Sequence, residues 1–350
     1  MKRLTIKDPA FIGSLTKADR DYVILGYTTN SPYLTAYTWE NDSFGTKYTP
    51  SSIVEGSITG VALHAEGNHI AVSYGTSPYV SVYEWNNPGF GVRTSPASPP
   101  PINALNVNFS KDGAYMSVSH NSTPGLNYKG LVVYPWSPSG GFGTKYESTS
   151  ALSFVLEATF SSNNNYIAIA SQAFPRGFVQ AWNSPGFGTT YSASPSLPGI
   201  GRSAVFTSDD NFIVFAHEGS PYVSSYEWDN PGFGTKRTPS SALTGRGRRV
   251  LFSENESYVI IAHDTSPYIS AYSWSSGVFG TKFSPSSVVE GNARDIFFNH
   301  DYTRIAVAHE SSPYVSVYEW TGSSFGTRFT PPAPINEGLG RGVIFTKQAQ

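Results

Sequence analysis

The chain contains no cysteine, and only 14% of its 350 residues carry a charge. The absence of cysteine excludes disulfide bonds and thiolate metal sites, although it leaves the cellular compartment open. The 23 basic and 25 acidic residues nearly balance, giving a net charge of −2. Sequence-independent binding to nucleic acid needs many cations that neutralise phosphates. We therefore expect no nucleic-acid partner.

Long apolar runs are also missing from the sequence. No segment approaches the length that is needed to span a bilayer. The first residues, MKRLTIKDPAF, include basic side chains but no apolar core of a signal peptide. We expect a soluble product that is made inside the cell and has no membrane span.

Aromatic residues, in contrast, make up 15% of the chain, and they recur at a fixed spacing. Successive tryptophans are 46 residues apart, except for one step of 51, and each precedes a Phe-Gly pair by five or six residues. Because every tryptophan fits this register, the sequence contains a true internal repeat. The seven tryptophans are Trp39, Trp85, Trp136, Trp182, Trp228, Trp274 and Trp320.

Each repeat unit has the pattern of four short β-strands. In residues 204–238 the runs AVFT, FIVFAH, YVSSYEW and TKRT are separated by turn-forming segments that are rich in Gly, Pro, Asp and Asn. A period in the forties that is built from strands is typical of propeller blades. We predict an all-β fold, a seven-bladed β-propeller of four-stranded antiparallel blades. It would form one domain over residues 15–350, preceded by an N-terminal arm at 1–14.

The two ends of the chain are expected to complete one blade together. With strands named a to d from the centre outward, strand a of blade 1 would fall at residues 15–17, where the sequence fits poorly. GRGVIFT at 340–346, however, resembles GRSAVFT at 201–207. We predict that residues 343–346 pair with residues 22–27 and close the ring, which removes an exposed sheet edge.

Two features of the unit resemble known repeat families. YEWDN at 226–230 and turns such as FSKDGAY at 109–115 are similar to the WD-repeat propellers, although the Gly-His pair and structural Asp of that family are absent. The whole unit AHxxSPYxxxYxW…GFGTKY is similar to propeller repeats of predicted bacteriophage virion proteins. This second resemblance implies a tail or capsid decoration or host-surface attachment protein that is located on the virion. Its partners would be other virion proteins or a host-surface protein or glycan.

Four successive units carry an arginine four residues before the phenylalanine of the inner strand, near one end of the predicted channel. Guanidinium groups match carboxylates and phosphates, so these arginines are candidates to bind an anion or an acidic partner. The alternative is that they pair between blades, with acids such as Asp295 or with backbone carbonyls. The four residues are Arg202, Arg248, Arg294 and Arg341, and the equivalent residues of blades 2, 3 and 4 are Thr59, Leu105 and Leu156.

The links between strands b and c of blades 3 and 4, at 121–130 and 172–178, depart from the Ser-Pro-Tyr consensus and are expected on one face of the disc. Their aromatic residues, Tyr128, Phe174 and Phe178, are candidates for exposed partner contacts. The seven tryptophans are instead expected between blades, although a sugar-stacking surface is the alternative.

Three histidines, His217, His263 and His309, end strand b in successive units, and each precedes an acid. Because one lies in each blade, they cannot converge on one substrate, and we expect them to hydrogen-bond the b–c turn. The sequence has no nucleophile elbow, HExxH motif or P-loop. We expect no catalytic residues, metal or cofactor.

These observations predict a non-enzymatic structural or binding propeller on a phage particle. A glycan-binding propeller lectin is one alternative. A propeller hydrolase or lactonase, assembled from several blades at the channel mouth, is the other.

Overall fold

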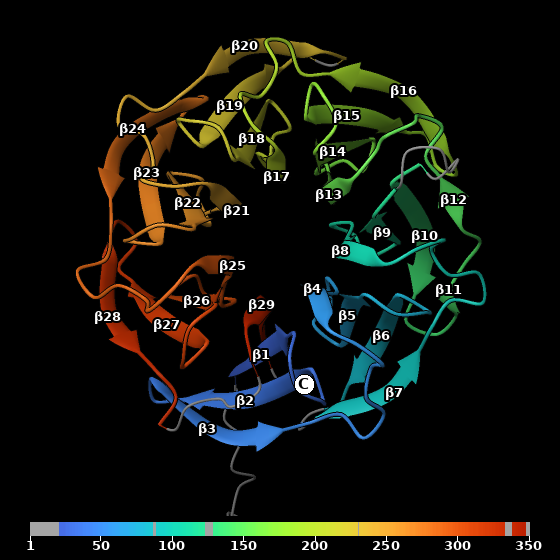
Figure 1. The fold of residues 1–350 in the computed structure, drawn as a ribbon, viewed down its shortest axis with the longest axis vertical. Helices are drawn as coiled ribbons and strands as arrows, with labels where there is room; N and C mark the ends of the chain where they lie inside the picture. Colours follow the sequence, from blue (N-terminus) through green and yellow to red (C-terminus); the bar gives the residue numbers. More distant parts are fainter. Residues whose placement is uncertain (1–20, 87–88, 123–128, 230, 333–337, 348–350) are drawn as a thin grey trace, which may run out of the picture.

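The computed structural model is a closed ring of seven antiparallel sheets (Figure 1). It describes residues 21–347, apart from 87–88, 123–128, 230 and 333–337. The predicted all-β, seven-bladed propeller is confirmed. The described residues contain strands but no helix, so none of them forms a helix that could cross a membrane. The predicted arm at 1–14 lies outside the described residues.

The blades are built alike, from a strand beside the channel to a strand at the rim. Strand a of blades 1 to 7 is, in order, β29 (Gly340–Lys347), β4 (Ile58–Leu63), β8 (Ala104–Phe109), β13 (Val155–Phe160), β17 (Gly201–Phe206), β21 (Gly247–Phe252) and β25 (Ala293–Phe298). Strand b is β1 (Asp21–Tyr27), β5 (His69–Tyr74), β9 (Tyr115–His120), β14 (Tyr166–Ser171), β18 (Phe212–His217), β22 (Tyr258–His263) and β26 (Arg304–His309).

Strand c carries the tryptophans. It is β2 (Leu34–Glu40), β6 (Val80–Trp85), β10 (Leu131–Ser137), β15 (Gly177–Trp182), β19 (Val223–Trp228), β23 (Ile269–Ser275) and β27 (Val315–Trp320). The rim strand d is β3 (Ser43–Tyr48), β7 (Phe90–Thr94), the pair β11 (Gly141–Phe142) and β12 (Tyr146–Glu147), β16 (Phe187–Ser192), β20 (Phe233–Arg237), β24 (Val278–Phe283) and β28 (Phe325–Phe329). Blade 3 is therefore the irregular one, because its rim strand is broken in two.

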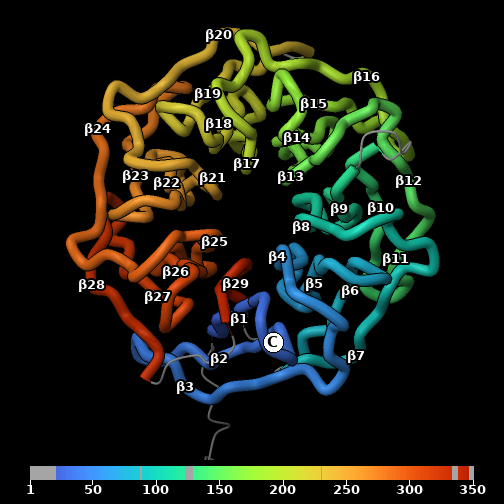
Figure 2. Tube along the Cα trace, viewed as in Figure 1, coloured from blue at the N-terminus to red at the C-terminus, as the bar shows by residue number. Residues whose placement is uncertain are grey.

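The C-terminal strand closes the ring as predicted. β29 pairs with β1 in antiparallel register, with Ile344 opposite Ile24, and the last and first described strands lie side by side (Figure 2). Val343, Ile344 and Phe345 are buried. Closure therefore supplies blade 1 with its inner strand and contributes three core side chains.

The hydrophobic core lies between the blades. Seven clusters of buried side chains each join two neighbouring blades, and all seven tryptophans are at most 8% exposed. Each tryptophan meets the phenylalanine of its own Phe-Gly pair edge to face, with ring centroids 5.4 Å apart for Trp228 and Phe233. Such T-shaped pairs are favoured by the ring quadrupoles. The expected burial of the tryptophans is thus confirmed, and the constant Trp-to-Phe spacing has a packing cause.

Polar groups also join the blades at repeated positions. The hydroxyl of Tyr226 donates to the carbonyl oxygen of Pro195 at 2.6 Å, and Tyr83 donates to Ser52 at 2.6 Å. Each of these bonds ties strand c to the connection that enters its blade. The sequence period therefore repeats a hydrogen bond as well as an apolar contact.

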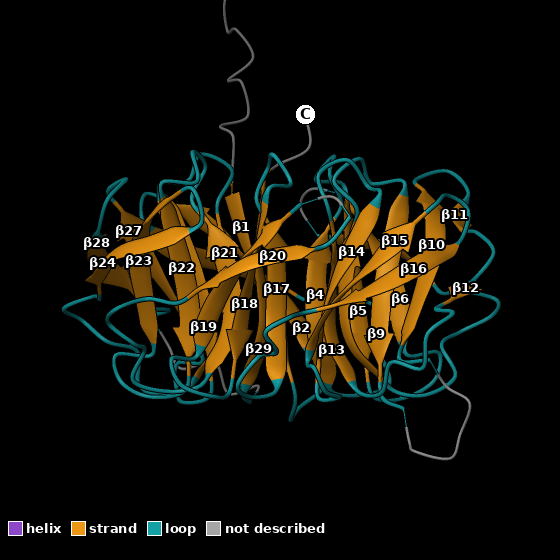
Figure 3. Cartoon of the chain, turned by 90° about the horizontal axis from the view of Figure 1, so that it is seen from above, coloured by secondary structure: helices purple, strands orange, loops and turns teal. Residues whose placement is uncertain are grey.

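Edge-on, the molecule is a disc with loops on both faces (Figure 3). We call the face with the b–c turns and d–a connections the upper face, and the face with the a–b and c–d turns the lower face. The a–b turns are held by their own side chains: Asp112 accepts from the backbone N–H of Ala114, and Ser110 accepts from that of Tyr115. This arrangement explains the polar FSKDGAY motif as a turn.

Candidate functional site

A bulge at the upper end of every inner strand aims one side chain into the channel. In β17, Gly201 pairs with His217 and Ser203 with Ala216, so Arg202 has no partner across the sheet. β-bulges commonly redirect a side chain in this way. The skipped residues in the seven blades are Arg341, Thr59, Leu105, Leu156, Arg202, Arg248 and Arg294.

All seven bulged residues line one cavity of about 340 Å³, together with Thr28 and Ile58. We call it the upper mouth. Its wall has two halves, because the four arginines come from consecutive blades 5, 6, 7 and 1. The other half is formed by Thr59, Leu105 and Leu156 from blades 2 to 4. The structure thus brings together the four arginines that the sequence singled out.

Acids at the ends of strand b hold the arginines in a chain that crosses the blade boundaries. Glu218 Oε1 accepts from Arg202 Nε at 2.7 Å and from Arg248 Nη1 of the next blade at 3.2 Å. Glu310 Oε1 lies 2.6 Å from Arg294 Nη2 and 3.3 Å from Arg341 Nη1 of the next blade. Pairing between blades therefore occurs, but Asp295 is not one of the partners of these four arginines.

Asp264 completes this chain in blade 6. Its Oδ2 accepts from Arg248 Nη2 at 2.8 Å and from Arg246 Nε at 2.7 Å. Burial opposes ionisation of Asp264, but the guanidinium groups of Arg248 and Arg246 outweigh it and hold the pKa of the carboxyl below its usual value. Burial likewise opposes ionisation of Glu310, but a hydrogen bond from Asn292 and the guanidinium groups of Arg294 and Arg341 outweigh it and lower its pKa. These two acids therefore stay ionised and fix the orientation of the arginines.

Positive charge nevertheless remains in excess at the upper mouth. Five guanidinium groups, including that of Arg246, meet three carboxylates, which leaves a net charge of two positive. Burial lowers the pKa of Arg202, Arg248 and Arg294, and each also feels a neighbouring arginine that lowers it further. In addition, Nε of Arg248 and Nε of Arg294 are buried and meet no acceptor in the described part of the chain. An anion in the cavity would relieve both the repulsion and the unmade hydrogen bonds.

In blade 6, β21 reaches this position because a glycine, Gly247, precedes Arg248. A Cβ added at Gly247 would lie 2.5 Å from the carbonyl oxygen of Tyr222 in the preceding blade. Only glycine permits that approach of the two backbones. Gly247 therefore brings Arg248 close enough to the neighbouring blade to share Glu218.

The periodic histidines do not take part in the upper mouth. His217, His263 and His309 are fully buried, and each Nε2 meets a serine hydroxyl on strand c of its own blade, at 2.9 Å for His217 and Ser224. This bond spans the b–c turn, and backbone groups of the turn, such as that of Gly219 for His217, also interact with the imidazole ring. Burial lowers the pKa of His217 to about 3 and that of His263 and His309 to about 4. They are neutral structural groups at physiological pH.

The three aromatic candidates have different outcomes. Phe174 is 74% exposed in the b–c turn of blade 4, as expected. The expectation that Phe178 is exposed is wrong: it lies in β15, is 7% exposed and packs between blades 3 and 4. Tyr128 lies outside the described residues. In the described ranges no three His, Asp or Glu side chains come close enough together to hold a metal ion.

The sequence reasoning missed the role of the three acids. The sequence pattern marks Glu218, Asp264 and Glu310 only as the acids after the periodic histidines, although each also follows a channel arginine by 16 residues. In blades 2 to 4, the two positions that are separated by the same 16 residues hold uncharged residues. The shared spacing of arginine and acid was the signal that could have identified the pairs.

Comparisons of the fold identify many solved propellers of the same architecture. A Bacteroides fragilis protein described as a candidate 6-phosphogluconolactonase has a TM-score of 0.69 and 11% identity, over 95% of this chain and 99% of that chain. The periplasmic gluconolactonase PpgL of Pseudomonas aeruginosa has a TM-score of 0.67 and 13% identity, over 93% and 99%. The β-propeller domain of Cps50 (Swd1) from Myceliophthora thermophila has a TM-score of 0.55 and 12% identity, over 79% and 87%. No protein-family model and no curated sequence matches the chain.

These matches share the fold at low identity, and they correct the expected function. The propellers with a functional name include lactonases, which are enzymes, and nothing among the findings supports a phage virion protein or an adhesin. The prediction of a non-enzymatic virion protein is therefore wrong. The sequence resemblance misled because it rested on motifs that the structure assigns to turns and to packing between blades.

Proposed function

We propose that the chain is a propeller hydrolase that opens a small anionic lactone in the upper mouth. The observation that carries this proposal is the divided wall of the cavity, in which four arginines face Leu105, Leu156 and Thr59. A phosphorylated or carboxylated sugar lactone offers an anionic group to the first half and a carbon skeleton to the second. The solved propellers named as lactonases add support from outside the chain.

The two shared acids divide the arginines into two pairs with separate tasks. Arg294 and Arg341, which share Glu310, bind the anionic group of the substrate. Arg202 and Arg248, which share Glu218, face the lactone carbonyl and stabilise the negative charge that develops on its oxygen during attack. Both pairs are held before substrate arrives, so little reorganisation is needed.

Glu218 is the proton acceptor in this proposal. Its Oε1 is occupied by Arg202 and Arg248, whereas its Oε2 lies 3.9 Å from Arg246 Nη1, beyond hydrogen-bond distance. Water adds to the carbonyl carbon and gives its proton to Oε2. The ring C–O bond then breaks, and the departing alkoxide takes that proton, which yields the open-chain hydroxy acid.

The test is hydrolysis of 6-phosphogluconolactone by the purified protein, measured as acid release above the spontaneous rate. We expect Arg294→Gln to lower kcat/KM about 10- to 100-fold, because a hydrogen bond to a charged group contributes about 1.5–3 kcal/mol. It should act mainly on KM. Glu218→Gln should lower kcat, and the unphosphorylated lactone should react more slowly than the phosphorylated one.

A matched arginine outside the channel provides the control. Arg304 pairs with Asp42, with Nε 2.7 Å from Oδ1. Arg304→Gln should leave kcat/KM unchanged. A rate equal to spontaneous hydrolysis with both lactones, or equal losses in Arg294→Gln and Arg304→Gln, contradicts the proposal.

A further inference from the structure

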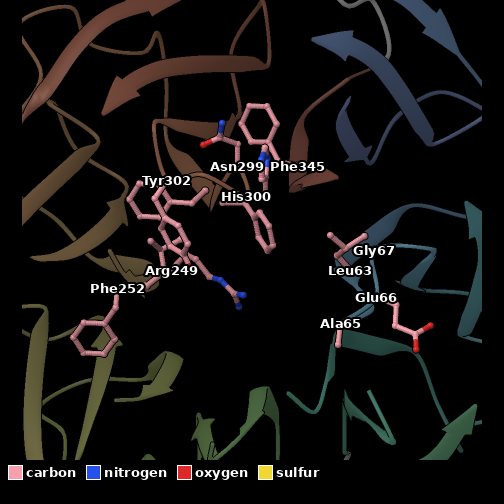
Figure 4. A pocket seen from close by; sticks show the side chains of 13 residues that line it. Leu63, Ala65, Glu66, Gly67, Arg249, Phe252, Asn299, His300, Tyr302 and Phe345 are labelled. Carbon is pink, nitrogen blue, oxygen red and sulfur yellow. The ribbon is translucent and has the colours of Figure 1, made fainter. Parts of the chain in front are cut away.

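A second cavity, of about 430 Å³, opens at the lower end of the channel (Figure 4). We call it the lower mouth. It is distinct from the upper mouth, since consecutive residues of β21 separate the two: Arg248 lines the upper one and Arg249 the lower one. Most of its wall is apolar, with contributions from Leu63, Leu251, Phe252, Phe297, Phe298 and Phe345. Figure 4 shows Leu63 and Ala65 across the opening from Tyr302 and Asn299.

The wall departs from the repeat where a ligand would lie. Leu251 and Phe297 occupy the fifth position of their inner strands and are only partly buried. The same position holds Ala62, Asn108 and Thr159 in blades 2 to 4, and the apolar Val205 and Ile344 in blades 5 and 1. Blades 6 and 7 thus expose large apolar side chains where the fold itself accepts small or polar ones.

Tyr302 is a second departure at the same mouth. It has φ = 55°, in the left-handed region, and its ring packs on Phe298 with centroids 5.1 Å apart. The equivalent turn residues are Gly67, Gly113, Asn164, Asp210 and Glu256. A bulky aromatic residue is disfavoured in this conformation, and Tyr302 is the one aromatic residue among these six turn positions.

Arg249 supplies a hydrogen-bond donor inside this apolar wall. Its Nη1 pairs with Glu157, and its Nε lies 3.2 Å from Asp295 Oδ1. The buried Nε makes no hydrogen bond in the described part of the chain, and the guanidinium group reaches into the opening (Figure 4). Because the carboxyl groups of both Glu157 and Asp295 already face this one guanidinium group, its remaining donor capacity favours a neutral acceptor over a further anion.

We propose that the lower mouth is a binding site for a small, uncharged, ring-bearing molecule with one carbonyl or hydroxyl acceptor. The rings pack against Leu251, Phe297 and Tyr302, and the acceptor takes a hydrogen bond from the guanidinium group of Arg249. Pockets of this size with mostly apolar walls and one oriented polar group are typical small-molecule sites. This site is separate from the proposed lactone site, and neither depends on the other.

The experiment uses the neutral naphthalene ketone Prodan as a fluorescent probe on the full chain. We expect a blue shift and saturable binding. Ala65 is exposed at the edge of the cavity, so Ala65→Trp fills the site without disturbing the core and should weaken binding by about tenfold or more. Tyr302→Asn, which installs a residue found in another blade, should weaken binding without lowering Tm.

The upper mouth provides the control. Arg294→Gln should leave the Prodan Kd unchanged, and Ala65→Trp should leave lactone hydrolysis unchanged. No blue shift with the full chain, or an equal Kd in Ala65→Trp, overturns the proposal. His300 in the cavity wall lies 3.4 Å from Asp21. Displacement of Prodan by a peptide of residues 1–20 would therefore identify that segment as the natural occupant, and this would overturn the small-molecule site.

Discussion

The ring has a charged half and an uncharged half that share one backbone. Blades 5, 6 and 7 and strand β29 place arginine at the bulge of the inner strand, whereas blades 2, 3 and 4 place Thr59, Leu105 and Leu156 there. The register skips at the same point in both halves, as Arg202 in β17 and Leu156 in β13 illustrate. The backbone therefore places seven equivalent residues at the channel. Which ligand the upper mouth can bind depends only on the side chains at these seven positions.

The acids follow the same division. Glu218, Asp264 and Glu310 stand at the end of strand b in the charged half, where the uncharged half has Gly75, Asn121 and Gln172. A buried guanidinium group is costly unless it is paired and hydrogen-bonded. Each channel arginine therefore has an acid that offsets the free-energy cost of burying its charge. The two halves differ in having or lacking these arginine–acid pairs.

The largest expected effect comes from removing the strand that joins the two halves. Deletion of residues 340–350 takes Val343, Ile344 and Phe345 out of the core, at about 1.5–3 kcal/mol for each side chain. That sum is comparable to the total stability of a domain. We expect loss of the cooperative thermal transition in near-ultraviolet circular dichroism. Deletion of 348–350 alone is the control, and an unchanged Tm in the longer deletion would contradict the role of β29.

Acid should weaken the charged half most, because it contains the three histidines whose pKa is lowered furthest, although burial also lowers the pKa of His69 and His120 in the uncharged half. Their pKa values, about 3 for His217 and about 4 for His263 and His309, lie below that of an unfolded histidine, so the unfolded chain binds more protons. Stability is therefore complete above about pH 6.5 and falls toward pH 4, by about 1.4 kcal/mol per pH unit for each histidine.

Urea denaturation at several pH values measures this slope. Replacing His217, His263 and His309 by phenylalanine one after another should reduce the slope between pH 4 and 6.5 in three similar steps. A slope that is unaffected by all three replacements would show that other groups cause the acid sensitivity.

A smaller effect is expected from transplanting one charged pair into the uncharged half. Leu156→Arg places a guanidinium group at the bulge of blade 4 without an acid, which should cost about 1–3 kcal/mol of unfolding free energy. Adding Gln172→Glu, at the spacing found in blades 5 to 7, should recover most of that loss. A double-mutant cycle with no coupling would show that spacing alone does not make the pair.

The smallest effect is expected at Phe174 on the upper face. Because its side chain is 74% exposed, Phe174→Ser should change the unfolding free energy by less than about 0.5 kcal/mol. The buried neighbour Phe178 is the matched comparison, since Phe178→Ala should cost about 3–5 kcal/mol. Equal effects of the two changes would contradict the assignment of one to the surface and the other to the core.

The sequence determined the number of blades, the order of strands and the closure by residues 340–346, because these follow from a repeat whose aromatic residues pack between identical neighbours. It also marked the four arginines, since their position in the repeat is constant. Their convergence on one cavity and the sharing of Glu218 and Glu310 between blades depend on the bulge and on ring closure, which bring together residues far apart in the chain.

The lower mouth could not be predicted from the sequence, because it forms only in the tertiary structure. Leu63, Arg249 and Tyr302 come from different blades and belong to no motif, so no local pattern links them. Local periodicity specifies contacts within and between adjacent blades, whereas a channel site is formed by the few residues that differ around the ring. Only the closed ring shows which of those differences face each other.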